Sequence, residues 1–206
     1  MEAFHLRPSS APYVFINSHG LGSDKNEWSR FQEKLKDAGY GYLSLDLRGH
    51  GASRTCAGKE VDYRDFSEAD WNNVSRDIEA AAAWLRKKGV PEKKMIFCGA
   101  SIGANLSLKA AAEGRLKPAA VILLSPGVEY AGVKTAENYI SKHTFKILVA
   151  ASEDDPYAWQ SYIYLSRSAS EKGLPADFIN GGSGHGVNMF KTPSVIPAIL
   201  TWVSGI

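Results

Sequence analysis

The sequence has few cysteines: only Cys56 and Cys98 occur among its 206 residues. So sparse a set excludes the disulfide framework of small secreted domains, and the Cys-x-x-Cys and Cys/His spacings of zinc sites are absent. Cys98 lies in an apolar run and Cys56 in an expected loop, so we expect neither to form a disulfide. The pattern predicts a reducing compartment, with the cytoplasm as the expected location.

Long apolar runs and an excess of one charge are also missing. No run approaches membrane-spanning length, and residues 1–12 have no apolar core of signal-peptide length. Lysine and arginine number 24 against 22 acidic residues, which gives a net charge of +2. The basic clusters at 86–88 and 93–94 fall at a predicted helix end and in the next loop, where positive charge is favoured. We therefore expect no membrane partner and no nucleic-acid partner.

The size and composition of the chain are typical of a globular enzyme-sized domain. Hydrophobic residues make up 44% of the sequence and charged residues 22%, which are ordinary proportions for a soluble protein. No repeat, low-complexity tract or interdomain linker interrupts the chain. We expect residues 1–206 to form one domain with a sizeable core. The oligomeric state cannot be read from the sequence.

Short apolar runs alternate with amphipathic stretches along the chain. The strand candidates are residues 13–17, 42–45, 95–98, 120–124, 147–151 and 176–179, with a weaker one at 3–6. Their continuous apolarity predicts strands that are buried on both faces, as in a parallel sheet. The arrangement predicts an α/β fold with a doubly wound, mostly parallel sheet of about six to seven strands flanked by helices.

The clearest helix candidate covers residues 68–88. Ser67 can cap its N-terminus, with Asp70 three residues later, and Gly89 ends it. Further helices are expected at 104–112 and at 194–203, the latter with Pro197 in its first turn or at a kink.

The most informative motif is the pentapeptide Gly-Ala-Ser-Ile-Gly at 99–103, between the strand candidate 95–98 and the helix candidate 104–112. A strand, a Gly-x-Ser-x-Gly turn and a helix form the nucleophile elbow, which exposes a serine hydroxyl at the edge of a sheet. The flanking glycines leave room for the tight turn. Ser101 is the candidate nucleophile; the alternative is a glycine-rich helix entry that packs closely on the sheet.

A serine nucleophile needs a base within hydrogen-bond reach and an acid that orients the base. His185 lies in a glycine-rich loop after the last strand candidate and is our candidate base, the alternative being a solvent-facing loop histidine. The other histidines are assigned to other loops or to polar stretches: His5, His19, His50 and His143.

The acid should follow a strand between Ser101 and His185. The run 147–151 leads into three acidic residues, and Asp155 is preferred because Pro156 restricts its backbone to an extended conformation. Asp154 is the second choice and Glu153 the third. The alternative interpretation of this cluster is a solvated acidic turn.

A tetrahedral intermediate also needs N–H donors for its negatively charged oxygen. The backbone N–H of Ile102 directly follows the nucleophile. The His-Gly turn at 19–20, after the strand candidate 13–17, makes the N–H of Leu21 the second expected donor.

With these motifs in place, the chain resembles the α/β-hydrolases over nearly its whole length. The segment 46–53, Asp-Leu-Arg-Gly-His-Gly-Ala-Ser, is similar to a loop of many members in which it is largely structural. The resemblance implies the fold and the triad order Ser, Asp, His. Dienelactone hydrolases of similar size use cysteine, so their substrate does not transfer. Many relatives carry a lid where this chain has only residues 125–145, so we expect no lid domain and an open site.

The resemblance implies a serine hydrolase that cleaves small or short-acyl carboxylic esters through an acyl-enzyme, without cofactor or metal. A small-molecule ester is the expected partner. A thioesterase or a small amide or peptide hydrolase would use the same machinery, and a noncatalytic binding module is the alternative from another class. Pocket candidates near the predicted catalytic loops, each equally compatible with ordinary packing, are Tyr130, Tyr157, Trp159, Met189 and Phe190.

Overall fold

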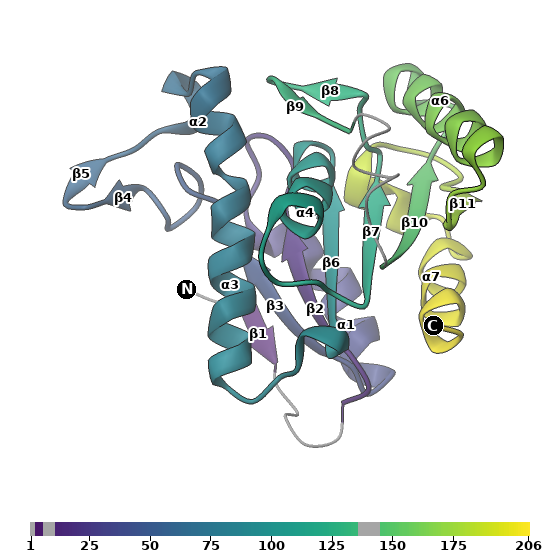
Figure 1. Ribbon diagram of the computed structural model, residues 1–206, viewed down its shortest axis with the longest axis horizontal. Helices are drawn as coiled ribbons and strands as arrows, with labels where there is room; N and C mark the ends of the chain where they lie inside the picture. Colours follow the sequence, from purple (N-terminus) through teal and green to yellow (C-terminus); the bar gives the residue numbers. More distant parts are fainter. Residues whose placement is uncertain (1–2, 6–10, 136–144) are drawn as a thin grey trace.

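The computed structural model describes residues 3–5, 11–135 and 145–206. Its centre is a seven-stranded sheet in the order β1-β3-β2-β6-β7-β10-β11 (Figure 1). The strands are β1 (Ala3–His5), β2 (Val14–Ser18), β3 (Gly41–Leu45), β6 (Met95–Ala100), β7 (Ala120–Leu124), β10 (Lys146–Ala151) and β11 (Ala176–Asn180). Only β1 is antiparallel to its neighbour; the other pairs are parallel. The predicted α/β sheet is confirmed, including the weak strand at its edge.

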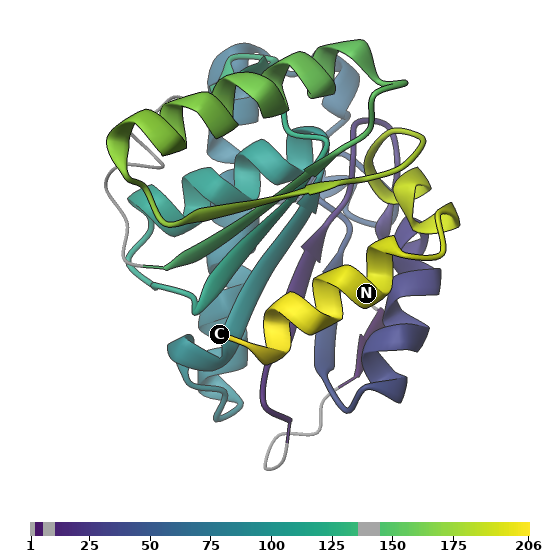
Figure 2. The same cartoon turned by 90° about the vertical axis from the view of Figure 1, so that its right-hand side faces the viewer.

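The central strands are apolar because helices cover both sides of the sheet. Every residue of β2, β6 and β7 is buried. One face is covered by α3 (Ser75–Lys87), α4 (Ile102–Glu113) and α6 (Pro156–Lys172), and the other by α1 (Ser29–Asp37) and α7 (Val195–Ser204) (Figures 1 and 2). Alternate residues of a strand point to opposite faces, so a doubly covered strand has no polar face.

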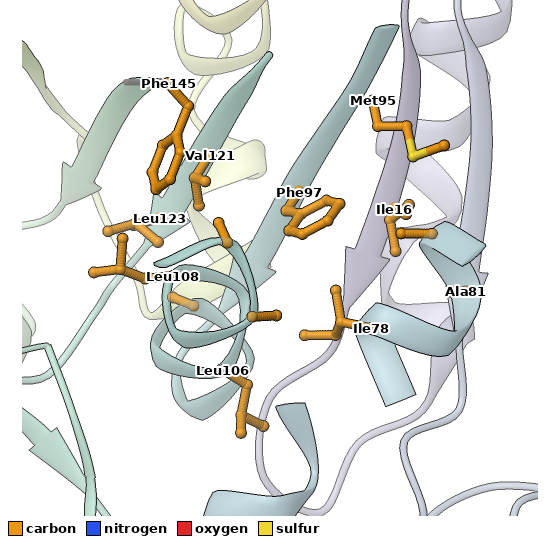
Figure 3. Packing of buried hydrophobic residues seen from close by; sticks show 14 of the residues in the cluster. Ile16, Ile78, Ala81, Met95, Phe97, Leu106, Leu108, Val121, Leu123 and Phe145 are labelled. Carbon is orange, nitrogen blue, oxygen red and sulfur yellow. The ribbon is translucent and has the colours of Figure 1, made fainter. Parts of the chain in front are cut away.

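Two hydrophobic clusters follow from this layering. On the α3 and α4 side, Ile16, Phe97 and Val121 of the sheet meet Ile78 and other helix residues (Figure 3). On the opposite side, aromatic side chains of α1 and the sheet pack together, with Phe15 edge-on to Phe31 at a centroid distance of 5.6 Å. The clusters hold the strands rigidly, which fixes the positions of the loops at their carboxyl ends.

The helix expected at 68–88 is two helices, α2 (Glu68–Asn73) and α3, so that prediction of one continuous helix is wrong. The start is as expected, since Ser67 and Asp70 form a capping box. The break at Val74 has a local cause. There the backbone bonds shift to the i−3 spacing, from the Val74 N–H to the Trp71 carbonyl oxygen at 3.0 Å and from the Asp77 N–H to the Val74 carbonyl oxygen at 2.9 Å. The Ser75 hydroxyl also donates to the Asn72 carbonyl oxygen at 3.1 Å.

Two small hairpins interrupt the alternation of strands and helices. One consists of β4 (Thr55–Cys56) and β5 (Lys59–Glu60), and the other of β8 (Glu129–Tyr130) and β9 (Val133–Lys134). The second lies in the connection between β7 and β10, where relatives carry a lid. Its described part is this hairpin and holds no separate lid domain; residues 136–144, including His143, lie outside the described residues.

The two cysteines are free thiols, Cys56 exposed and Cys98 buried, as expected. Among the described helices, none combines the length and apolarity required to span a bilayer. A cavity of about 470 Å³ lies between β3 and α3, lined by residues that include Leu43, Arg48 and Trp84. Its lining contains neither Ser101 nor His185, so it is separate from the predicted site.

Candidate active site

Ser101 occupies a strained turn between β6 and α4. Its backbone has φ 55° and ψ −126°, a region that L-residues rarely adopt and that is often found at functional sites. A Cβ at Gly99 would lie 2.1 Å from the Gly103 carbonyl oxygen, and one at Gly103 would lie 2.3 Å from the Ser18 carbonyl oxygen. Both positions therefore require glycine. The arrangement presents the Ser101 side chain, only 8% exposed, at the carboxyl edge of the sheet.

His185 and Asp155 meet at the same edge. The His185 Nδ1 atom lies 2.5 Å from the Asp155 Oδ2 atom. Asp155 is the N-cap of α6, where its carboxylate also accepts from the Ala158 N–H, and Pro156 fills the first helical position. A carboxylate bound at Nδ1 fixes the tautomer of a neutral imidazole, so the Nε2 atom is left to act as a base.

Asp154, the second choice for the acid, bonds to the two residues that precede His185. It accepts from the Ser183 hydroxyl at 2.6 Å and from the Gly184 N–H at 2.9 Å. The Ser183 bond and then the Gly184 bond lower its pKa. Glu153, the third choice, accepts from the Asn180 side chain. Asp154 thus anchors the loop that carries His185.

Ser125 provides a second anchor for that loop, which the sequence did not reveal. Its hydroxyl accepts the Gly186 N–H at 2.8 Å. Ser125 directly follows β7 and has a positive φ of 50°. No local sequence pattern links Ser125 to a residue 61 positions away.

The predicted oxyanion loop lies against the nucleophile. A Cβ at Gly20 would lie 3.4 Å from the Ser101 Cβ. The Gly20 N–H is already donated to Glu27 Oε1 at 3.0 Å; the predicted donor, the Leu21 N–H, is the next one along the chain. On the other side of Ser101, the Ile102 N–H is in the first turn of α4, where helices leave N–H groups without intrahelical partners. The Glu27 carboxyl group is largely buried, and this burial raises its pKa above the ordinary value.

The histidines of this region support the loops. His19 is fully buried; its Nδ1 bonds to the Gly20 carbonyl oxygen at 2.8 Å, and its Nε2 accepts the Leu47 N–H at 3.0 Å. Burial lowers its pKa to about 4, so the imidazole is neutral at pH 7. His50 similarly bonds to the Arg48 carbonyl oxygen and accepts the Gly22 N–H. Both histidines fix the backbone, as the resemblance implied for His50.

Asp46 is likewise occupied by structural bonds. It accepts the Lys25 N–H, the Lys25 ammonium at 2.6 Å and the Ala52 N–H. Its carboxylate ties the start of the 46–53 loop to the segment that leads into η1 (Lys25–Trp28). This leaves no role for Asp46 as the orienting acid.

Tyr130 is the pocket candidate that reaches the nucleophile. Burial raises the pKa of its phenol and the neighbouring Ser101 side chain lowers it, and its ring packs edge-on to that of Tyr157 at a centroid distance of 5.4 Å. The remaining pocket candidates pack elsewhere: Met189 and Phe190 are buried in the core, and Trp159 stacks on Tyr162.

Asn105, one turn after Ser101 on α4, holds the β8–β9 hairpin and was also missed from the sequence. Its fully buried amide donates to the Gly127 and Val133 carbonyl oxygens at 3.1 and 2.7 Å and accepts the Gly127 N–H at 3.2 Å. Over the described ranges, no group of three or more acidic, histidine or cysteine side chains is placed to bind a metal ion.

Comparison with known proteins shows the family of the chain. Residues 10–164 match the family described as "Serine aminopeptidase, S33", a range that includes Ser101 and Asp155 and ends before His185. The chain belongs to this family. No curated protein matches the sequence.

Solved structures show the same fold at low sequence identity. MenH from S. aureus has a TM-score of 0.72 and 13% identity, with 99% of this chain and 98% of that chain covered. A structure from a study of Nitrososphaera gargenis carboxylesterases has a TM-score of 0.72 and 14% identity, with coverage of 100% and 93%. Monoglyceride lipase from Saccharomyces cerevisiae has a TM-score of 0.69 and 14% identity, with coverage of 97% and 89%. This chain is therefore an α/β-hydrolase, similar in fold to esterases and lipases.

Proposed function

We propose that this protein is a serine hydrolase that cleaves carboxylic esters of small or short-acyl substrates. The observation that carries the proposal is the 2.5 Å pairing of His185 Nδ1 with Asp155 Oδ2 at the sheet edge where the elbow presents Ser101. A nucleophile, a base and an orienting acid are the parts that acyl transfer requires. Esterase and lipase structures of the same fold support this reaction class.

In the proposed mechanism, Ser101 Oγ attacks the ester carbonyl while His185 Nε2 takes the serine proton. Asp155 holds the imidazole and stabilises its charged form. The N–H groups of Leu21 and Ile102 receive the negative oxygen of the tetrahedral intermediate. The intermediate collapses, His185 gives its proton to the leaving alcohol, and water hydrolyses the acyl-enzyme by the same steps.

The family description favours a second candidate, a hydrolase of small amides or peptides that uses the same residues. Purified protein should be assayed on matched ester, thioester and amide substrates with one acyl group. Faster turnover of the amide than of the ester would replace the first candidate by the second.

The catalytic proposal itself is tested at Ser101. A fluorophosphonate probe should label the wild-type protein and leave Ser101→Ala unlabelled, because labelling requires an activated serine. Loss of a triad member typically lowers turnover by roughly 10⁴ to 10⁶. A noncatalytic binding module would show neither labelling nor turnover in the wild type.

A further inference from the structure

The Tyr130 hydroxyl belongs to a half-buried side chain beside the nucleophile, and a triad mechanism has no role for it. It donates to the Ser125 carbonyl oxygen at 3.4 Å, and the Ser101 side chain is among the groups that act on it. Burial, and then the negative charge of Asp155, raise the pKa of this phenol. The hydroxyl therefore stays protonated at neutral pH and can act as a hydrogen-bond donor.

The hairpin holds this hydroxyl in one position. A Cβ at Gly127 would lie 2.7 Å from the Tyr130 ring, so the ring packs directly on the backbone of the segment that leads into the hairpin. The Asn105 amide fixes both sides of the hairpin to α4, the helix that begins at the nucleophile. The Tyr157 hydroxyl donates to the Glu129 carbonyl oxygen at 2.6 Å, next to Tyr130 in the chain. The Tyr130 oxygen is thus held in place, as electrostatic catalysis requires, and its proton is on the long 3.4 Å bond to the Ser125 carbonyl oxygen, from which a substrate oxygen can take it over.

The order of the strands indicates which substrate oxygen this donor faces. In the sheet, β2 lies on one side of β6, and β7 and β10 lie on the other. The loop after β2 carries Leu21, so the carbonyl oxygen is expected on that side of Ser101. Tyr130 follows β7, and its ring packs against that of Tyr157, two residues after Asp155 and beyond the end of β10, so Tyr130 and Asp155 both lie on the opposite side. His185, which bonds to Asp155, must deliver its proton to the leaving oxygen on that second side.

We propose that the Tyr130 hydroxyl is a catalytic group that donates a hydrogen bond to the leaving-group oxygen of the ester. This inference rests on the proposed function. As the tetrahedral intermediate collapses, the bond between the acyl carbon and the leaving oxygen breaks, and its electron pair goes to that oxygen. The proton comes from His185 Nε2. Tyr130 keeps its own proton and stabilises the charge that develops before the transfer is complete.

This role makes a prediction that depends on the leaving group. A good leaving group such as p-nitrophenolate carries its charge unaided, whereas an alkoxide needs stabilisation. Tyr130→Phe removes only the hydroxyl. We expect it to lower kcat/KM on ethyl acetate by about 10- to 100-fold, the range for a hydrogen bond to a charged group. On p-nitrophenyl acetate the change should stay within about threefold.

The experiment measures kcat/KM for acetate esters of p-nitrophenol, phenol, trifluoroethanol and ethanol with the wild type, Tyr130→Phe and Tyr157→Phe. Tyr157→Phe is the matched control, because its hydroxyl supports the same hairpin without contacting Ser101. The dependence of log kcat/KM on leaving-group pKa should steepen in Tyr130→Phe only. Active-site titration with a fluorophosphonate corrects each rate for the folded fraction.

An equal loss on all four esters, matched by Tyr157→Phe, would mean that Tyr130 merely supports the hairpin and would overturn the inference. If Tyr130→Phe keeps the wild-type kcat/KM values and the wild-type dependence of log kcat/KM on leaving-group pKa, the inference is also overturned. If instead Ser101→Ala retains full ester hydrolysis, the proposed function fails, whatever the behaviour of Tyr130→Phe. The two failures are therefore distinguishable.

Discussion

The neutral, buried His19 makes the stability of this protein depend on pH in a definite direction. An unfolded histidine titrates near pH 6.5, whereas burial lowers the pKa of His19 in the folded protein to about 4. As the pH falls between these values, the His19 imidazole takes up a proton in the unfolded chain but not in the folded chain. Stability therefore falls with pH across this window. Protonation of Nε2 would also place an N–H against the Leu47 N–H, which now donates to that nitrogen.

The magnitude follows from the width of the window. One pH unit corresponds to about 1.4 kcal/mol, so lowering the pH from 7 to 4.5 should cost roughly 2.5 kcal/mol at His19 alone. His50, whose pKa burial also lowers, adds a loss of the same sign. Glu27 acts in the opposite direction, because burial raises its pKa and the folded state takes up that proton first.

Urea denaturation of the wild type and of His19→Gln at both pH values isolates the contribution of His19. The glutamine oxygen can accept the Leu47 N–H without titrating in this range. The variant should lose roughly 2.5 kcal/mol less than the wild type between pH 7 and 4.5. An equal loss in both proteins would refute the reasoning. If the variant does not fold, NMR titration of the wild-type imidazole decides, because its signal should not move above pH 5.

Three further predictions follow from the site and its glycines. Asp155→Asn should lower kcat by up to roughly 10⁴ by stabilising the wrong imidazole tautomer, whereas Asp154→Asn should lose much less; a larger loss at Asp154 would transfer the role of the acid there. Gly103→Ala should abolish folding, because its Cβ would lie 2.3 Å from the Ser18 carbonyl oxygen. Gly205→Ala is the control and should fold, because the nearest atom to its Cβ would be 3.6 Å away. Circular dichroism of both variants checks the prediction. Specificity constants on p-nitrophenyl esters should plateau or fall beyond short acyl chains, because an uncovered methylene gains none of the about 0.8 kcal/mol of burial; a steady rise would indicate a deep apolar channel.

The strands could be predicted because a strand that is buried on both faces of the sheet has apolar residues at every position. The prediction for β7 matches its observed bounds, and the elbow at Ser101 was readable because the glycines are dictated by the adjacent backbone. The break at Val74 was not readable, since it is a local shift of backbone hydrogen bonds to the i−3 spacing that helical periodicity does not encode.

Support for the site was hidden for a different reason. The bond between Asn105 and Gly127 joins residues 22 positions apart, and the acceptance of the Gly20 N–H by Glu27 depends on how the chain turns after β2. Such contacts exist only once strands have been placed side by side. The order of Asp155 and Asp154 was favoured by Pro156, but the partners of each carboxylate became visible only in three dimensions.

The hydrogen bonds of Asn105 allow substrate preference to change during evolution without a change in the geometry around Ser101. The three bonds of Asn105 go to backbone atoms of the hairpin, so they are indifferent to the side chains on the outer surface. The exposed Val128 side chain can therefore change without releasing the hairpin from the nucleophile helix. Substitutions on this outer surface of the hairpin can then alter substrate preference while the geometry around Ser101 stays the same.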